Sequence, residues 1–240
     1  MVNWARMYDC YGDVDRVPEL LVRLEREDDA EAWDELGHRL ILESDMVFPA
    51  SFAALPRLVC LASRSASARE LAGAIVRRAA GGHGCDDLLA GCVEALTEFR
   101  ELLDLQLRSR PDDYLAVFRD LLAVESLYHW SAVLGDFSDD FYQVACPHCA
   151  AEVTIAIGGY GHYSAIRDWN LGDVDRRDLR PVSPETLCGP GRWMYETAVR
   201  DGEAALADGL THLFGHAECP RCASVFNIAD EYASSHRPPM

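Results

Sequence analysis

Four of the nine cysteines fall in two Cys-x2-Cys pairs, and these pairs constrain the fold more than any other feature of the sequence. Cys146-Pro-His-Cys149 and Cys219-Pro-Arg-Cys222 each place two thiols on one tight turn, with residues 150–218 between the pairs. Four thiolates about 2.3 Å from one ion complete a closed, tetrahedral zinc shell. We therefore expect Cys146, Cys149, Cys219 and Cys222 to bind one structural zinc ion, Zn2+, which brings two distant segments of the chain together.

Strand-like segments flank both cysteine pairs. Residues 141–145 lead into the first pair, residues 152–157 follow it, and residues 223–228 follow the second pair. Alternating polarity and β-branched side chains in these segments are typical of strands. The order of strand, cysteine turn and strand resembles a zinc ribbon, and the resemblance implies a small β unit whose folding depends on the metal. We expect His148, which stands between two better placed thiols, to be exposed and not a ligand.

The sequence Cys-Pro-His-Cys also matches the dithiol of thiol oxidases, which is the alternative to zinc. In those enzymes the first cysteine lies at a helix N-terminus, whose dipole lowers the thiol pKa. Here strand-like residues follow the first pair, and a second matching pair is present. Both observations favour the metal. Since four thiolates leave no coordination position for water, we expect the zinc to be structural and not catalytic.

Residues 1–138 show helical periodicity almost throughout, with apolar side chains recurring every three or four positions. The simplest interpretation is six helices in three antiparallel pairs. Asp28 and Asp29 stand where the second helix would begin, and we expect them to cap it. The third pair is expected to consist of one long helix over residues 86–103 and another over residues 112–127.

Two prolines suggest a repeat within this region. Pro18-Glu-Leu and Pro56-Arg-Leu lie about 40 residues apart, and each stands in the first helix of a predicted pair. The match is best over residues 47–80. This pattern resembles the HEAT and armadillo-like repeats of bacterial proteins, which implies an α-solenoid whose concave surface binds other proteins. The alternative is a helical bundle with coincidental prolines, since the third pair has no proline in its first helix.

These patterns predict an α+β chain of two domains. Residues 1–138 are expected to form a HEAT-like α-helical domain of about three helix pairs. Residues 139–240 are expected to form a zinc-ribbon domain that contains an inserted loop and helix over residues 158–213. Within this insertion, residues 158–193 are predicted to be a long loop and Met194–Leu213 to be a helix.

The predicted loop over residues 158–193 is rich in aromatic and charged side chains, and loops of this length are usually functional or disordered. The residues expected to contact a ligand or a partner are Tyr160, His162, Tyr163, Arg167, Asp168 and Trp169. The alternative is structural: Trp169 anchors the loop against the helical region, and His162 is merely a surface residue.

Three further groups of residues could carry chemistry. Residues 81–87 hold a glycine-flanked histidine and cysteine, but the glycines and aspartates are typical of a connection between two helices. His212 and His216, four residues apart, could face a second metal, although the sequence places no third ligand beside them. The isolated cysteines expected to be small core residues are Cys10, Cys60 and Cys92.

Charge excludes several kinds of chemistry. The chain has 40 acidic and 22 basic residues, for a formal charge of −18, and every one of its basic residues is arginine. Without lysine there can be no Schiff-base lysine, pyridoxal phosphate lysine or phosphate-loop lysine. The acidic balance argues against nucleic acid, because affinity for phosphates comes largely from basic residues. Most of the negative charge lies in residues 1–140.

Together these observations predict a non-catalytic, zinc-binding interaction protein of bacterial origin. An adaptor or an immunity-like protein would meet a basic protein partner through its acidic helices. We expect no nucleic acid and no membrane partner, and we expect a cytoplasmic location, since the first residues do not resemble a signal peptide. One alternative is an enzyme or accessory subunit with a site between the helices and residues 158–193, using His162, Tyr163, Arg167 and Asp168. Another is a zinc-ribbon transcription factor.

Overall fold

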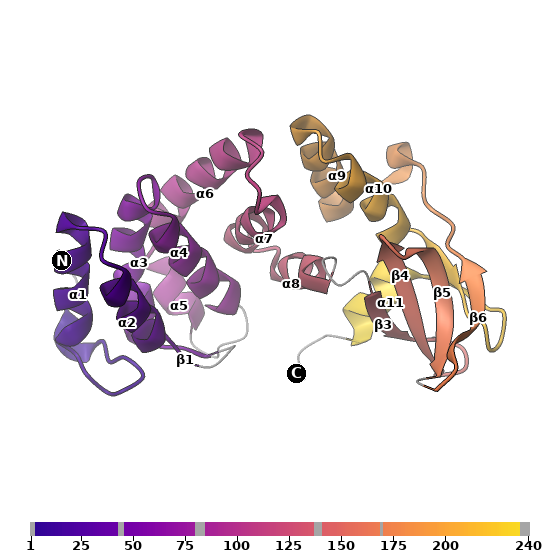
Figure 1. Cartoon of the computed structure of the whole chain (residues 1–240), viewed down its shortest axis with the longest axis horizontal. Coiled ribbons are helices and arrows are strands. Elements are labelled where there is room, and N and C mark those ends of the chain that lie inside the picture. The colour runs from indigo at the N-terminus through magenta and orange to yellow at the C-terminus, as the bar shows by residue number, and fades with distance from the viewer. Residues whose placement is uncertain (1–2, 43–45, 80–84, 137–140, 169, 236–240) are drawn as a thin grey trace. The chain divides into compact units, whose positions relative to one another are not determined.

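The computed structural model describes residues 3–42, 46–79, 85–136, 141–168 and 170–235 (Figure 1). It is a mixture of helix and sheet, which is consistent with the predicted α+β class. The chain divides into two compact units, Met1–Ser131 and Ala132–Met240, and each unit is described by itself below. This division falls slightly before the boundary expected at residue 138. Among the described residues, no helix is both long enough and apolar enough to cross a bilayer.

The first unit is helical. Its helices are the short 3-10 helix η1 (Trp4–Arg6), α1 (Arg16–Arg26), α2 (Ala30–Leu40), α3 (Pro49–Ala62), α4 (Ala66–Ala79), α5 (Cys85–Ala90), α6 (Val93–Arg108), α7 (Tyr114–Val124) and α8 (Tyr128–Asp136), the last of which continues past the boundary. Two-residue strands, β1 (Ile41–Leu42) and β2 (Met46–Val47), pair between α2 and α3. The expected N-terminal cap of α2 is confirmed, because the Asp29 side chain accepts a hydrogen bond from the Ala32 amide at 3.1 Å.

Three helix pairs stack in this unit. Helices α1 and α2, α3 and α4, and α6 and α7 pack as pairs; α3 also contacts α1 and α6, while α4 contacts α2 and α7. The first helices and the second helices of the pairs therefore form two rows. Helix α3, in the middle of its row, is buried on nearly every side. Burial of its apolar residues, including Phe52, Leu55 and Leu58, provides much of the hydrophobic stabilisation of the unit.

The third pair differs from its prediction. The expected long helix over residues 86–103 is two helices, because Gly91 and Cys92 form tight turns onto the carbonyls of Leu88 and Leu89. The helix predicted over residues 112–127 ends at Val124, and α8 follows it. Residues 81–84 of the predicted connection at 81–87 lie outside the described residues. Of the isolated cysteines expected in the core, only Cys92 is buried, while Cys10 is half-buried and Cys60 is exposed.

The two prolines do not occupy equivalent positions. Pro18 lies in the first turn of α1, where a missing amide costs little, but Pro56 lies in the interior of α3. Pro56 cannot donate to the Phe52 carbonyl one turn before it. The buried Cys92 thiol donates to that carbonyl at 3.4 Å, and burial raises the pKa of this thiol, which keeps its proton. A side chain from outside the helix thus replaces the hydrogen bond that the proline removes.

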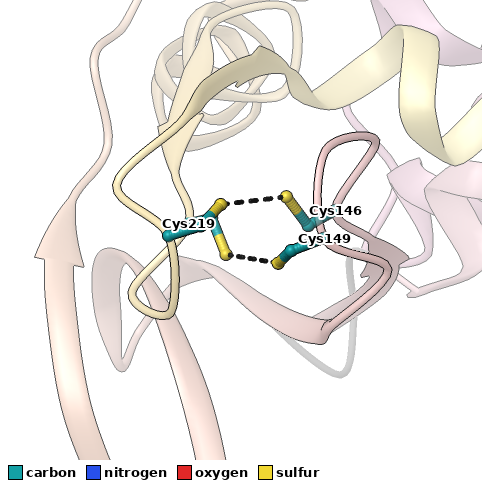
Figure 2. A group of neighbouring side chains, drawn as sticks. Cys146, Cys149 and Cys219 are labelled. Carbon is teal, nitrogen blue, oxygen red and sulfur yellow. Dashed lines mark hydrogen bonds between the residues drawn. The ribbon is translucent and has the colours of Figure 1, made fainter.

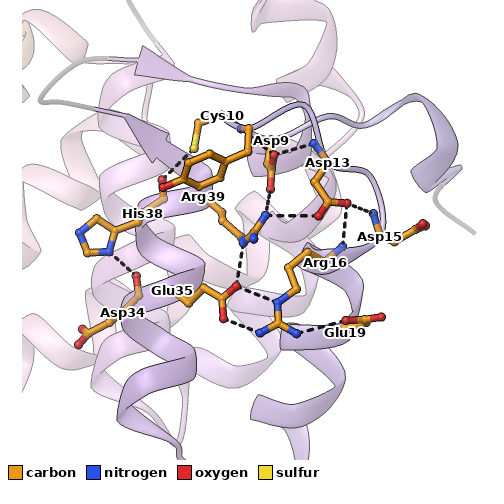
Figure 3. Close-up of polar contacts among 11 residues, drawn as sticks. Asp9, Cys10, Asp13, Asp15, Arg16, Glu19, Asp34, Glu35, His38 and Arg39 are labelled. Carbon is orange, nitrogen blue, oxygen red and sulfur yellow. Dashed lines mark hydrogen bonds and ion pairs between the residues drawn. The ribbon is translucent and has the colours of Figure 1, made fainter.

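Ion pairs join α1, α2 and the segment before α1 (Figure 3). Arg16 binds Glu35 through two parallel hydrogen bonds of 2.8 and 2.6 Å, and Arg39 contacts both Glu35 at 3.0 Å and Asp9 at 2.6 Å. The Asp9 side chain is fully buried, and its carboxylate also accepts the amides of Tyr11 and Asp13. Hydrogen bonds from Arg16, followed by those from Arg39, lower the pKa of Glu35 to about 2. The ion pair with Arg39 neutralises the Asp9 carboxylate, which would otherwise be a buried, unpaired charge.

A buried ion pair joins α4 to α7. The Asp120 carboxylate of α7 is buried, pairs with Arg77 of α4 and lies directly against the Cα of Gly73. A side chain at position 73 would occupy the space of this carboxylate. Glycine is therefore required at this crossing because a charged group of the neighbouring helix fills the place of its side chain.

The second unit is built on an antiparallel sheet. Its strands follow one another in the order β3 (Phe141–Ala145), β4 (Glu152–Gly158), β5 (Gly161–Asp168) and β6 (Gly172–Asp178). The helical elements after the sheet are the 3-10 helix η3 (Pro184–Thr186), α9 (Gly189–Asp201), α10 (Ala204–Leu213) and α11 (Ile228–Ser235). A separate hairpin, β7 (His216–Glu218) with β8 (Val225–Asn227), lies between α10 and α11.

The prediction that residues 158–193 form a loop is wrong. Strands β5 and β6 occupy much of this range, and β5 pairs with both β4 and β6. Strand β6 has the sequence Gly-Asp-Val-Asp-Arg-Arg-Asp, whose charges resemble a solvated loop but are characteristic of an exposed edge strand. The helix predicted over Met194–Leu213 is also two helices, because Gly202 adopts a left-handed conformation (φ 79°) that ends α9.

The two faces of the sheet differ. Register places Tyr142, Ile155 and Ser164 side by side on one face, together with His162. Helices α10 and α11 cover this face, through contacts with β4 and β3 respectively, and the Tyr142 ring meets the Tyr232 ring edge-on at 5.5 Å. The other face carries a small apolar cluster of Ala156, Tyr163 and Ala165, against which Phe141 packs.

Replacing Gly73 with alanine should lower the free energy of unfolding by about 2–4 kcal/mol, because the new methyl group must displace the buried Asp120 carboxylate from Arg77. Gly37 is the matched control. It lies within α2 with open space where a Cβ would be, so Gly37→Ala should stabilise by up to about 1 kcal/mol. Urea unfolding followed by circular dichroism measures both. Equal effects of the two substitutions would contradict the close packing described at Gly73.

Candidate metal centre

The two cysteine pairs meet in the second unit. The Sγ atoms of Cys146 and Cys222 are 3.7 Å apart, and those of Cys149 and Cys219 are 3.8 Å apart. All four sulfur atoms lie within 4.8 Å of one another. Figure 2 shows Cys146 and Cys149 projecting from one turn toward Cys219 on the other. A disulfide requires sulfur atoms about 2.05 Å apart, so these are four separate thiols.

The spacing of the sulfur atoms fits a tetrahedral ion. With metal–sulfur bonds of about 2.3 Å, the edge of a tetrahedron of sulfurs is about 3.8 Å. The two measured separations, 3.7 and 3.8 Å, agree with this length. The four cysteines therefore form a cluster that is compatible with a metal site, with its ligands converging from two separate hairpins.

The two turns share one backbone geometry. In the first, the Cys146 amide donates to the Ala151 carbonyl at 2.8 Å, and the Ala150 amide donates back to the Cys146 carbonyl at 2.9 Å. In the second, the Cys219 amide bonds Ser224 and the Ala223 amide bonds Cys219 in the same pattern, at 2.9 and 2.8 Å. Each turn thus holds its two thiols on one side.

Both turns contain an alanine in the left-handed region. Ala150 has φ of 56° and Ala223 has φ of 59°, a conformation that favours glycine and costs an alanine roughly 1 kcal/mol. The two turns bend through the same position, one residue after the second cysteine. This common backbone bend is consistent with a common function in positioning sulfur.

Each cysteine turn is fixed by a hairpin. The first connects β3 to β4 at the edge of the four-stranded sheet, and the second connects β7 to β8. The second hairpin is attached to the sheet by Ser164 of β5, whose hydroxyl donates to the Glu218 carbonyl at 2.6 Å, and by paired backbone hydrogen bonds of 2.9 Å between Arg180 and His216. These contacts hold Cys219 close to the first turn.

The surroundings separate the acidities of the thiols. The hydroxyl and the amide of Ser224 stabilise the thiolate of Cys222 and lower its pKa to about 6, whereas burial raises the pKa of Cys219 to about 12. Cys222 therefore ionises more readily than Cys219. A cation at the centre of the cluster would favour the thiolate form of its ligands, since a bound metal deprotonates the thiols that bind it.

The environment of the first pair differs from that of a redox dithiol. Cys146 and Cys149 lie in a turn between two strands, and no helix begins at this turn. The dipole that lowers the thiol pKa in thiol oxidases is therefore missing here. The exposed His148 stands in the same turn, outside the group of potential ligands.

Three of the residues expected to contact a ligand lie on the face of the sheet opposite α10. The buried Asp173 carboxylate of β6 accepts hydrogen bonds from Tyr163 at 2.7 Å and from Arg167 at 2.9 Å, and Arg176 binds it at 2.6 Å. Tyr160 stacks on the Phe141 ring, and Arg167 lies over that same ring at 4.4 Å. Desolvation and then the Asp173 hydrogen bond raise the pKa of Tyr163.

The remaining expected residues are placed elsewhere. Asp168 accepts the Asn170 and Leu171 amides and so caps the turn between β5 and β6, while Trp169 lies outside the described residues. His162 projects from the opposite face of the sheet, where its ring stacks on His212 at 3.8 Å between ring centroids. Tyr163 and His162 therefore cannot share one site, because neighbouring residues of a strand face opposite ways.

His212 and His216, which could have faced one metal together, are instead separated in the fold. His212 of α10 lies with Asp208 and His162, whereas His216 is exposed on β7. Burial, and then the neighbouring His212, lower the pKa of His162. Sequence reasoning missed Asp208, although Asp208 and His212 at positions i and i+4 of a helix were a local signal. No local pattern could place His162 in this group, because its position beside α10 follows from the pairing of β4 with β5.

Comparison with known proteins identifies no relative of this chain. No family model matches the chain, and neither the curated proteins nor the solved structures give a significant match.

The left-handed alanine of the second turn gives a test of this geometry. Ala223→Gly should leave the second unit as stable as before or stabilise it by up to about 1 kcal/mol, while Ala223→Val should destabilise it by about 2 kcal/mol. The matched control is Ala145→Gly in the exposed end of β3, which should cost about 0.5–1 kcal/mol because a glycine weakens a strand. Thermal unfolding measures the difference. A loss at position 223 as large as that at position 145 would contradict the assigned bend.

Proposed function

We propose that this chain is a non-catalytic interaction protein whose second unit is held together by a structural zinc ion. The observation that carries the proposal is the convergence of four thiols with the separations that a tetrahedral zinc shell requires. Cys146, Cys149, Cys219 and Cys222 would be its four ligands. Two similar cysteine turns on antiparallel hairpins support the interpretation of this region as a zinc ribbon with a large insertion, residues 158–213.

Zinc would supply stability that the hairpin of β7 and β8 lacks. Its strands are three residues each, and isolated two-stranded hairpins are marginal in water. The metal would connect this hairpin to the turn between β3 and β4, although residues 150–218 separate the two cysteine pairs in the sequence. Since a closed shell of four thiolates has no open position, the ion would act in folding and not in hydrolysis.

The helical unit is the proposed binding surface. Its three stacked pairs, with first helices against first helices and second against second, support an interpretation as a short HEAT-like α-solenoid. The exposed residues Glu94, Glu98 and Glu101 form an acidic stripe along α6, one turn after another. This stripe and the negative charge of residues 1–140 favour a basic protein partner, as for an adaptor or an immunity-like protein.

The enzyme alternative has less support. Its four residues do not share a surface, since Tyr163 and Arg167 bind Asp173 on one face of the sheet, His162 projects from the other, and Asp168 caps a turn. A transcription factor is disfavoured by the overall charge of −18. Interaction through protein surfaces is therefore the proposed activity.

Removal of the metal tests the structural part of the proposal. The purified chain should contain one tightly held zinc ion, and a strong chelator should unfold the second unit, because structural zinc sites contribute on the order of 10 kcal/mol to folding. Cys219→Ser should lose this ion and lower the thermal midpoint, whereas the control Cys188→Ser, at an exposed cysteine of the same unit, should do neither. Metal analysis and calorimetry measure these effects. A metal-free protein of unchanged stability would contradict a structural zinc.

The products of the genes next to its own are the partners to test. A basic protein among them should bind with an affinity that falls as salt is raised. Replacing Glu94, Glu98 and Glu101 together by glutamine should weaken binding about tenfold and flatten its salt dependence. The control removes exposed carboxylates of the second unit, Glu152→Gln with Glu185→Gln, and should leave the affinity unchanged. Titration calorimetry at two salt concentrations measures these affinities. Equal losses of affinity in the two variants would contradict the proposal that the partner binds α6.

A further inference from the structure

A second group of potential ligands lies in the second unit, under α10. His162 of β5, together with Asp208 and His212 of α10, places one ligand atom from each residue within 4.8 Å of the others. Nε2 of His162 is 3.7 Å from Oδ2 of Asp208, and Nδ1 of His212 is 3.9 Å from that same oxygen. Two imidazoles and a carboxylate thus surround one point. All three residues are separate from the cysteine cluster in sequence and in chemistry.

Regular secondary structure places the three side chains. Asp208 and His212 are four residues apart on α10 and therefore lie on one side of the helix. His162 pairs with Ile157 across the sheet and faces the side that α10 covers. The site is therefore built on a helix and a strand whose positions are fixed by packing, which is the kind of support that a metal site needs.

Hydrogen bonding orients one imidazole for coordination. Nδ1 of His212 lies 3.1 Å from the backbone carbonyl of Asp208, and a carbonyl can only accept, so Nδ1 carries the proton. The Nε2 lone pair is then left for a ligand bond, and the 3.9 Å between Nδ1 and the Asp208 carboxylate shows only that the two residues are neighbours. Histidines that bind metals commonly donate their other ring nitrogen to a carbonyl or carboxylate in this way.

The two imidazoles stack on each other, but neither is hydrogen-bonded to the Asp208 carboxylate. A separation of 3.7 Å between His162 and Asp208 is longer than a hydrogen bond, and the Asp208 side chain keeps 60% of its surface exposed. In a site with metal–nitrogen and metal–oxygen bonds of about 2.1 Å, neighbouring ligand atoms lie about 3.0–3.4 Å apart. The His162 and His212 rings stack at 3.8 Å between centroids, so a change of rotamer has to turn the rings apart before each imidazole directs a nitrogen at the same ion as the carboxylate.

We propose that His162, Asp208 and His212 form a second metal site, which binds a divalent transition metal through two imidazole nitrogens and one carboxylate oxygen. This ligand set suits zinc, nickel and copper, and differs from the all-sulfur set of the cysteine cluster. With three protein ligands the coordination shell is open, so water or an added ligand completes it. The second site is thus suited to exchangeable metal, in contrast to the closed cysteine site.

A groove beside the carboxylate gives an added ligand room to approach. It has a volume of about 530 Å³ and is lined by Asp208 together with Thr211 of α10, Tyr195 and Val199 of α9, and Val182. Most of its surface is apolar. A small molecule that occupies this groove would have an apolar body and a metal-binding group directed at Asp208. Metal binding to the three side chains does not depend on this occupant.

Nickel titration of the protein carrying a single equivalent of zinc, which the cysteine cluster takes up, tests the proposal. We expect calorimetry to show one equivalent of Ni2+ bound without release of zinc, which a colorimetric zinc indicator follows in parallel. His162→Gln and Asp208→Asn should each weaken nickel binding at least tenfold, because each removes one of three ligands. His216→Ala is the matched control. It removes an exposed histidine that stands four residues after His212 in the sequence but lies on β7, and it should leave the affinity for nickel unchanged.

Copper gives an independent readout. The electron paramagnetic resonance spectrum of one equivalent of Cu2+ should show coupling to two nitrogens in the native chain and to one in His162→Gln. Thermal midpoints of the variants in the absence of added metal establish that they fold. Asp208→Asn, at an exposed side chain, carries the test if His162→Gln does not fold. The proposal is overturned if no equivalent binds beyond the cysteine site, if His162→Gln binds as well as the native chain, or if only His216→Ala loses binding.

Discussion

The convergence of four sulfur atoms is the constraint on which the second unit depends. Hydrogen bonds within the sheet order its four strands, while hydrogen bonds of Ser164 and Arg180 and the ion pairs of Arg177 and Arg180 with Glu218 attach the hairpin of β7 and β8. The two cysteine turns have the same backbone bend and meet at the distances of a tetrahedral shell. An ion held there would stabilise the end of the sheet and the packing of α10 and α11 together, since both helices adjoin this hairpin in sequence.

Charge, in contrast, organises the first unit. The arginine network of Arg16 and Arg39 pairs the buried Asp9, and Arg77 pairs the buried Asp120. In an acidic chain without lysine, arginine is the only permanent cation that can neutralise these carboxylates, and its planar group satisfies two oxygens at once. The buried charges therefore fix how neighbouring helices cross. Acidic residues outnumber basic ones by 40 to 22, and this excess of negative charge would attract a basic partner.

Much of this architecture could be predicted from local patterns. Helical periodicity gave the stacked pairs, Asp29 capped the helix that it was expected to cap, and the spacing of the cysteines gave the cluster before any distance was known. Predictions failed where local sequence and tertiary environment disagree. Strand β6 was mistaken for a loop because an exposed edge strand needs no apolar residues, and the long helix expected over residues 86–103 is divided by the turns at Gly91 and Cys92.

The sequence by itself determined that this chain would contain helices, cysteine turns and a four-thiol cluster, because caps, periodicity and Cys-x2-Cys turns are set by residues close together in the chain. Only the tertiary structure decided which distant side chains meet. His162 lies against Asp208 and His212, instead of beside its neighbour Tyr163, because the register of β5 turns the two residues to opposite faces of the sheet. Strand register and helix packing depend on the whole unit, and so no local pattern could specify the second group of ligands.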